Sequence, residues 1–210
     1  MKRLSIILLV AIVSISSYAI NEAKETAKES GSTSFQPKPL DDNWNKWLVG
    51  EWEFSADSDA GAATGRTKIE FGLNGQFLIM KSEVEITEIT DEQRQYLKET
   101  LHASDEDIEG YQNSTFKGLQ IHTVDPKTGE VIGYLFDSMR CIAYGRGKRE
   151  ENKEIIEWKW FGNAQGASSI GITERINDNK FTYNHKYILP NGNKMEDKVE
   201  FTRKKIKTEK

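Results

Sequence analysis

From residue 47 to the C-terminus, hydrophobic and polar side chains alternate in short runs separated by Gly, Asn, Asp and Pro. This alternation is typical of antiparallel strands with one buried face, and the residues between the runs favour tight turns. The pattern predicts ten strands at even spacing, as in a closed or nearly closed sheet. The predicted strands cover residues 47–55, 65–73, 76–88, 114–124, 130–137, 140–148, 154–161, 168–177, 180–189 and 194–204.

One segment, residues 90–110, interrupts the alternation. Thr90 and Gln93 have the spacing of a helix-capping box, and Ser104 and Asp107 repeat it. Apolar residues between the two pairs recur at helical spacing. We therefore expect a short helical insertion between the third and fourth strands, which either covers one mouth of a barrel or is a surface excursion.

The turn at Asn74-Gly75 sets the register of the first hairpin. A two-residue type I′ turn needs positive φ at both central residues, which Asn and Gly tolerate best. This turn pairs Thr67 with Ser82, Ile69 with Met80 and Phe71 with Leu78.

Two further turns set the register of the last three strands. A two-residue turn at Asp178-Asn179 pairs Glu174 with Tyr183 and Ile172 with His185. The next loop needs an odd number of residues to keep the apolar face of the last strand inside. Residues 190–192, with Gly192 left-handed, meet this need. The pairs that follow are His185 with Asp197, Tyr187 with Met195, Tyr183 with Val199 and Phe181 with Phe201.

These registers place several aromatic and ionisable side chains inside the barrel. Directly opposite residues have Cβ atoms about 4.5–5.5 Å apart, so Asp197 can accept a hydrogen bond from His185. Glu174 lies within reach of the Tyr183 phenol. Such residues either form a satisfied polar layer that stiffens the barrel or line a ligand cavity. The candidate ligand-binding residues are Trp158, Trp160, Glu174, Tyr183, His185, Tyr187 and Asp197.

The sequence predicts four parts along the chain. Lys2-Arg3, an apolar run and small residues up to Ala19 are typical of a secretory signal peptide over residues 1–19, so we expect export to the periplasm or the medium. No transmembrane span is expected after its removal. A flexible linker (20–42), the barrel domain (43–205) and a basic tail (206–210) follow.

Composition and charge exclude several classes of function. Removal of the signal peptide changes the formal charge from −4 to −6, and no basic face indicates nucleic-acid binding. The single cysteine, Cys141, forms no internal disulfide and is expected to be a buried apolar side chain. No catalytic, nucleotide-binding or metal-binding motif is present, so we expect no cofactor and no catalytic residue. The sequence makes no prediction of oligomeric state.

Several segments together resemble the bacterial domain-of-unknown-function family 1579. They run in order from the first strand to the last over about residues 44–205. The resemblance implies a calycin-like barrel, related in shape to lipocalins, fatty-acid-binding proteins and haem-carrying nitrobindins, and it implies no activity. Leu135 stands where that family usually has Trp, and the 90–110 helix is an addition. The segments are Trp47-Leu48-Val49-Gly50-Glu51-Trp52, Asn74-Gly75-Gln76-Phe77, Phe116-Lys117-Gly118, Asp125-Pro126-Lys127-Thr128-Gly129, Asp137-Ser138-Met139 and Glu200-Phe201-Thr202-Arg203-Lys204.

The sequence therefore favours a non-enzymatic carrier or sensor of a small hydrophobic or amphipathic molecule, held in a cavity of about 300 Å³ or more. An enzyme that uses His185 and Asp197 as a general-base pair is one alternative. Haem ligation by His185, as in nitrobindin-like barrels, is a second. A structural or interaction protein without a ligand is the third.

Overall fold

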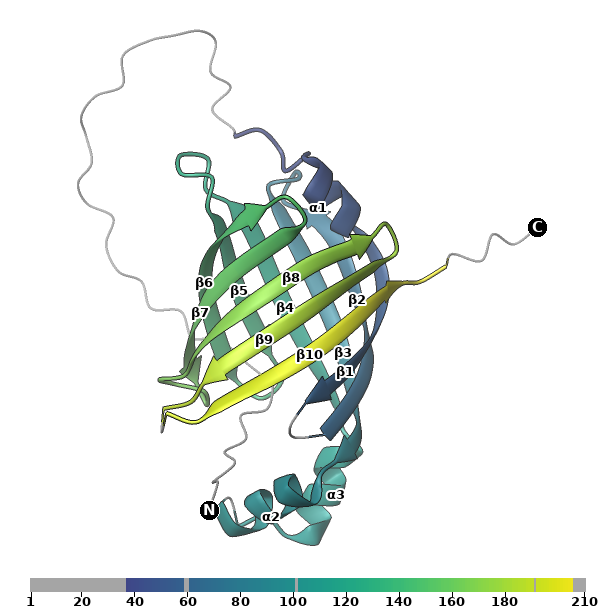
Figure 1. Ribbon diagram of the computed structural model, residues 1–210, viewed down its shortest axis with the longest axis vertical. Coiled ribbons are helices and arrows are strands. Elements are labelled where there is room, and N and C mark those ends of the chain that lie inside the picture. The colour runs from purple at the N-terminus through teal and green to yellow at the C-terminus, as the bar shows by residue number, and fades with distance from the viewer. Residues whose placement is uncertain (1–36, 59–60, 101, 191, 206–210) are drawn as a thin grey trace, which may run out of the picture.

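The computed structural model describes residues 37–58, 61–100, 102–190 and 192–205. Ten antiparallel strands form a closed barrel, in which consecutive strands pair and the first strand pairs with the last (Figure 1). The helices are α1 (Asn43–Leu48), α2 (Asp91–Thr100) and α3 (Asp105–Gln112). The strands are β1 (Gly50–Ser58), β2 (Gly61–Gly72), β3 (Phe77–Ile89), β4 (Thr115–Val124), β5 (Val131–Asp137), β6 (Cys141–Glu150), β7 (Lys153–Gly162), β8 (Ser168–Asn177), β9 (Lys180–Ile188) and β10 (Lys194–Arg203).

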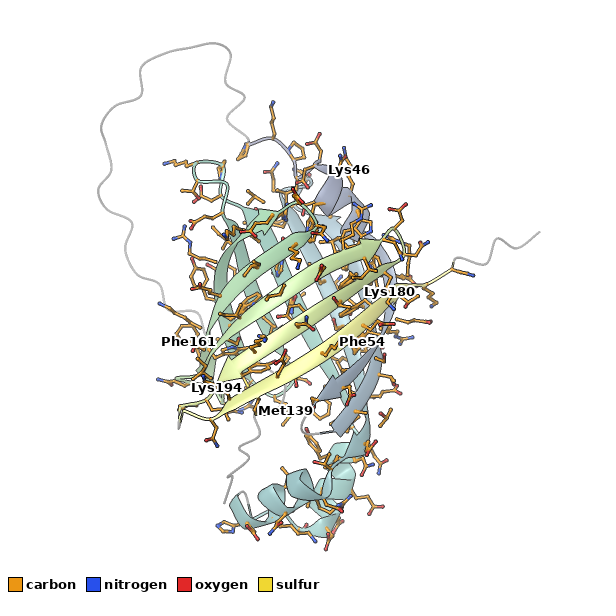
Figure 2. The ribbon with its side chains drawn as sticks, in the orientation of Figure 1. Lys46, Phe54, Met139, Phe161, Lys180 and Lys194 are labelled. Atoms are coloured by element: carbon orange, nitrogen blue, oxygen red, sulfur yellow. The ribbon has the colours of Figure 1, made fainter. Side chains whose placement is uncertain are left out.

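The predicted all-β barrel is confirmed, and the strands lie within a few residues of the predicted ranges. The start of the first strand is the exception, because Trp47 and Leu48 belong to α1. Asp42 caps this helix by accepting a hydrogen bond from the Asn45 amide at 2.9 Å. Trp44, Trp47 and Leu48 then share one buried face at i, i+3, i+4 spacing. The helix thus lies across one end of the barrel, where Figure 2 labels its exposed Lys46.

The two hairpins with the clearest turn chemistry have the predicted registers. Asn74 and Gly75 have φ values of 57° and 78°, and β2 pairs with β3 as predicted. Gly192 has φ 83°, and Leu189 donates to Asn193 O across the predicted three-residue loop at 2.9 Å. As a result β9 pairs with β10 residue for residue as predicted, His185 with Asp197 included.

Helices α2 and α3 lie beyond the opposite end of the barrel from α1 (Figure 1). Ser104 and Asp107 form the predicted capping box at the start of α3. Ile108 of α3 is 1% exposed, and Tyr111 packs on Phe116 of β4 with ring centroids 5.4 Å apart. We call the two ends of the barrel the α1 end and the α3 end.

The chain before the barrel is in contact with it from residue 37. Leu40 donates a hydrogen bond to Gly75 O at 2.8 Å, and the Gln76 side chain donates to Pro37 O at 2.9 Å. The predicted signal peptide, most of the linker and the basic tail lie outside the described residues, so the predicted domain boundaries stay predictions. No helix within the described part of the chain is long and apolar enough to span a membrane.

Candidate ligand-binding site in the barrel

Six of the seven predicted site residues lie on the inner face of the barrel. β7 contributes Trp158 and Trp160, which are 2% and 3% exposed. β9 contributes Tyr183, His185 and Tyr187, and β10 contributes Asp197 opposite His185. His185 is at the centre of this group, because its ring centroid lies 5.9 Å from that of Trp160, 5.1 Å from that of Tyr183 and 4.0 Å from that of Tyr187.

The predicted inner position of Glu174 is wrong. β8 pairs Asn177 with Lys180 and then Arg175 with Phe181, so Ile176 forms a bulge. One extra residue reverses the two faces of the rest of the strand. Glu174 therefore lies on the outer face, where its carboxylate is 3.2 Å from Lys153 Nζ. The predicted inner position of Ile172 is wrong for the same reason, since Ile172 pairs with Asn184.

The bulge turns a different β8 residue inward, Ser169, which the sequence did not single out. Ser169 is 4% exposed, and its Oγ accepts a hydrogen bond from Trp160 Nε1 at 2.8 Å. The same Oγ lies 2.7 Å from His185 Nε2. Burial lowers the pKa of His185 to about 3, so the imidazole is neutral at pH 7.

His185 and Asp197 are opposite each other, yet they do not form the predicted hydrogen bond. The one nitrogen of His185 that is not bonded to Ser169, Nδ1, has no hydrogen-bond partner among the described residues. A general base also needs a pKa near the working pH, and burial lowers the pKa of His185 far below neutral pH. The pairing is confirmed, but it does not assemble a general-base pair.

Two tyrosines beside His185 hold buried, neutral hydroxyl groups. Burial raises the pKa of Tyr183, and burial together with the charge of Asp197 raises that of Tyr187. Neither hydroxyl forms a hydrogen bond of ordinary geometry with a described residue, but that of Tyr183 lies beside Trp158 and that of Tyr187 beside Asp197. A buried donor without a partner costs about 1–3 kcal/mol, so such groups are expected where a ligand supplies the missing bond.

A cavity of about 170 Å³ lies inside the barrel towards the α3 end. It is smaller than expected, and its volume is close to the ~150 Å³ of an apolar cavity that accommodates benzene. The cavity exists because β1 and β2 carry small inner residues near the α3 end, among them Ala56, Ser58 and Ala63. The rest of the wall is mostly apolar, with Thr67, Ser82 and Gln120 as further polar residues. Its apolar residues are Val84, Ile86, Phe116, Leu135, Met195, Val199 and Phe201.

Three of the predicted site residues line this cavity: Tyr183, His185 and Asp197. Trp158, Trp160 and Tyr187 pack behind them, so they support the wall. Tyr111 of α3 also lines the cavity, and its hydroxyl has no hydrogen-bond partner among the described residues. The helical insertion thus contributes to the mouth, which favours the first of its two predicted roles.

The sequence analysis missed a second buried polar group, which lies towards the α1 end. Glu154 is 3% exposed and accepts a hydrogen bond from Arg149 Nε at 2.8 Å, while His122 Nδ1 is 3.6 Å away. Arg149 also donates to Asn45 of α1 at 2.9 Å. Burial alone would raise the pKa of Glu154, but His122 and Arg149 lower it overall. This charge network attaches α1 to the barrel.

A wider hollow of about 950 Å³ lies at the wall formed by β6 to β10, and its lining residues include Trp158 and Tyr187, two of the predicted site residues. It is open to solvent, and the cations Arg146, Lys159, Lys186 and Lys194 alternate there with Glu157 and Glu196. Arg146 and Lys186 form ion pairs with Glu130 and Glu196. Solvated charges of this kind do not select an apolar ligand, so the inner cavity is the candidate site. No group of three His, Cys, Asp or Glu side chains in the described segments is placed to hold a metal ion.

Comparison with solved structures identifies the fold. The S-type phycobiliprotein lyase CPES from Guillardia theta matches with a TM-score of 0.50 and 14% sequence identity, over 78% of this chain and 92% of that chain. The fold is a calycin-like β-barrel. At this identity the likeness shows the fold alone.

Two other solved barrels match more weakly. EF1p2_mFAP2b bound to DFHBI has a TM-score of 0.37 and 9% identity, over 76% of this chain and 95% of that chain. A protein of unknown function from the DUF3598 family of Nostoc punctiforme has a TM-score of 0.25 and 7% identity, over 79% of this chain and 100% of that chain. No family model and no curated protein matches the chain, so membership of family 1579 stays a prediction.

Proposed function

We propose that the protein binds a small, mostly apolar molecule in the barrel cavity and performs no chemistry on it. One observation carries the proposal: a mostly apolar cavity inside the barrel is lined by two buried polar residues, Tyr111 and His185, that have unused hydrogen-bonding atoms in the described structure. Small-ligand sites usually combine apolar walls with a few such polar groups. A cavity of about 170 Å³ limits the ligand, or the part of it that is buried, to about one or two rings.

The same geometry disfavours two of the alternatives. A porphyrin has four pyrrole rings and exceeds this cavity, and the Nε2 atom of His185 is already bonded to Ser169. A purely structural barrel would gain stability from a filled interior and from partners for Tyr183 and Tyr111. Neither the volume nor these hydroxyls fit such a role.

Filling the cavity tests the proposal. Ala56 lines the cavity, so Ala56→Leu places three more carbons inside it. The neighbouring Ser55 is exposed on the outer face, so Ser55→Leu is the matched control. Acetophenone is a suitable probe because it has one ring and one carbonyl. It should raise the Tm of the wild type and of Ser55→Leu, since ligands that bind only the folded state stabilise it, and it should leave the Tm of Ala56→Leu unchanged. Equal shifts in all three proteins, or none in the wild type, would contradict the proposal.

We further propose that the chain is exported to the periplasm or the medium, because Lys2-Arg3 and the following apolar run have the order of a signal peptide. N-terminal sequencing of the mature protein from those fractions should begin at Ile20. A mature N-terminus at Met1 would contradict export by cleavage.

A further inference from the structure

A buried chain of hydrogen bonds fixes which nitrogen of His185 carries the proton. An indole N–H only donates, so Ser169 Oγ accepts the bond from Trp160 Nε1 at 2.8 Å. Ser169 has a single hydroxyl proton, and the other polar atom within hydrogen-bonding distance is His185 Nε2, at 2.7 Å. If the Ser169 hydroxyl donates to Nε2, then Trp160 Nε1, Ser169 Oγ and His185 Nε2 each have a hydrogen-bond partner. If Nε2 itself carried a proton, the serine hydroxyl would have no acceptor. The proton of the neutral imidazole is therefore on Nδ1.

Two donors of cavity-lining residues have no partner among the described residues, His185 Nδ1–H and the Tyr111 hydroxyl. The Tyr183 hydroxyl instead lies against Gly171 and Trp158, neither of which lines the cavity. His185 is 1% exposed, so a missing hydrogen bond at this position is not replaced by bulk water. These two donors favour a ligand with a hydrogen-bond acceptor, and Gln120, which also lines the cavity, can both donate and accept.

The charges around the cavity decide which kind of acceptor fits. No Lys or Arg is among the described residues that line it, whereas the carboxylates of Asp197 and Glu88 do line it. In a low-dielectric interior, a carboxylate ligand would be repelled and would find no cation to pair with. A fatty acid or another organic anion is therefore a poor match.

We infer that the ligand is a neutral molecule of about one or two rings whose carbonyl, or a similar uncharged oxygen acceptor, receives a hydrogen bond from His185 Nδ1–H or from the Tyr111 hydroxyl. This inference rests on the proposed function and names its ligand class.

Three probes of similar size and different polarity test the inference on the purified wild-type protein. They are acetophenone with a neutral carbonyl, ethylbenzene with no acceptor and benzoate with a negative charge, each titrated by calorimetry. Acetophenone should bind roughly fivefold to tenfold more tightly than ethylbenzene, which corresponds to one net hydrogen bond. Benzoate should bind at least about tenfold more weakly than acetophenone, because its charge is buried without a partner.

Each outcome of this titration is decisive. If benzoate binds best, or if acetophenone and ethylbenzene bind equally, the inferred ligand class is wrong while the cavity still binds small molecules. If none of the three probes binds, the proposed function itself fails.

Two matched variants and one spectroscopic measurement test which atoms cause the preference for acetophenone. Tyr111→Phe removes an unpartnered hydroxyl of a cavity-lining residue and should reduce the preference for acetophenone over ethylbenzene about threefold or more. Tyr134→Phe makes the same change on the outer face, where Tyr134 is 44% exposed, and should leave the preference unchanged. The ¹⁵N chemical shifts of His185 should report a neutral ring protonated at Nδ1, and a proton on Nε2 would overturn the assigned tautomer.

Discussion

The interior of the barrel is packed with aromatic rings at one end and contains a cavity at the other. At the α1 end Trp47, Trp52 and Phe181 lie edge to face, with ring centroids 4.7–5.8 Å apart. At the α3 end the inner positions of the same strand, β1, carry Ala56 and Ser58, and a cavity takes the place of the rings. One end is a packed core, and the other contains the cavity of the proposed site.

The difference shows that hydrogen-bonded registers alone do not make a cavity. β1 pairs continuously with β2 and β10 from one end to the other, so the backbone is equally regular at both ends. What changes is side-chain volume and the element at the mouth: α1 inserts tryptophans, whereas α3 contributes one tyrosine to the cavity wall. A barrel of this size is filled by large inner residues and hollow only where they are small.

The largest contrast is expected for loss of an aromatic ring at the two ends. Trp52 is fully buried, donates to Leu48 O at 2.8 Å and lies under the Arg203 guanidinium at 4.1 Å. Trp52→Ala should lower the free energy of unfolding by about 3–5 kcal/mol. Phe54, the next inner residue of β1, borders the cavity and is only partly buried. Phe54→Ala should cost less than half as much in urea denaturation, and equal losses would show that the α3 end is packed as tightly.

Two glutamates test the electrostatic side of the contrast. Glu154→Gln breaks the buried pair with Arg149 and should cost about 3 kcal/mol. Glu174→Gln breaks a solvent-exposed pair with Lys153 and should cost at most about 1 kcal/mol. Because the folded-state pKa of Glu154 is lowered, its contribution is present above its unfolded pKa of about 4.3 and is lost as the pH falls further. Urea denaturation of both variants at pH 7 and pH 3.5 measures this, and similar losses for the two would contradict the buried network.

Adding volume should give a smaller contrast of the opposite kind. Ala143 is fully buried in the packed wall of β5, β6 and β7, so Ala143→Leu should destabilise the protein by about 1–3 kcal/mol through overpacking. Ala56→Leu adds the same atoms to the cavity and should change the free energy of unfolding by less than about 1 kcal/mol. If both variants lose equal stability, the cavity is not available volume.

The registers of the hairpins were predictable because their turns have demanding backbone chemistry. Asn74-Gly75 and Gly192 need positive φ, and each fixed the pairing of the strands it joins. No residue with demanding backbone chemistry marks the bulge at Ile176. The extra residue lies near the end of β8, so the alternation of polar and apolar residues along the rest of the strand gives no sign of it. The error for Glu174 follows from that one residue.

Other site residues were missed although the sequence contains a signal for them. Glu154 has the same parity as Ile156, Trp158 and Trp160, so extending that face by two residues would have placed it inside. Asp42 before Trp44, Trp47 and Leu48 is a helix start with an apolar face, which the strand prediction from residue 47 overlooked. The volume of the cavity had no such signal, because it depends on how rings from several strands pack together.

The last expected effect concerns pH and belongs to the α3 end. Burial lowers the folded-state pKa of His185 to about 3, against about 6.5 in the unfolded chain. Between these values the unfolded state binds a proton that the folded state does not, so stability is full above about pH 6.5 and falls as the pH decreases towards 3. The slope from this one group is at most about 1.4 kcal/mol per pH unit. His185→Gln has no titrating ring, so the difference in unfolding free energy between it and the wild type should shift in favour of the variant between pH 7 and pH 5. A difference that stays constant over this range would mean that water or a counter-charge reaches the imidazole, and the dry cavity wall inferred for this end would then be wrong.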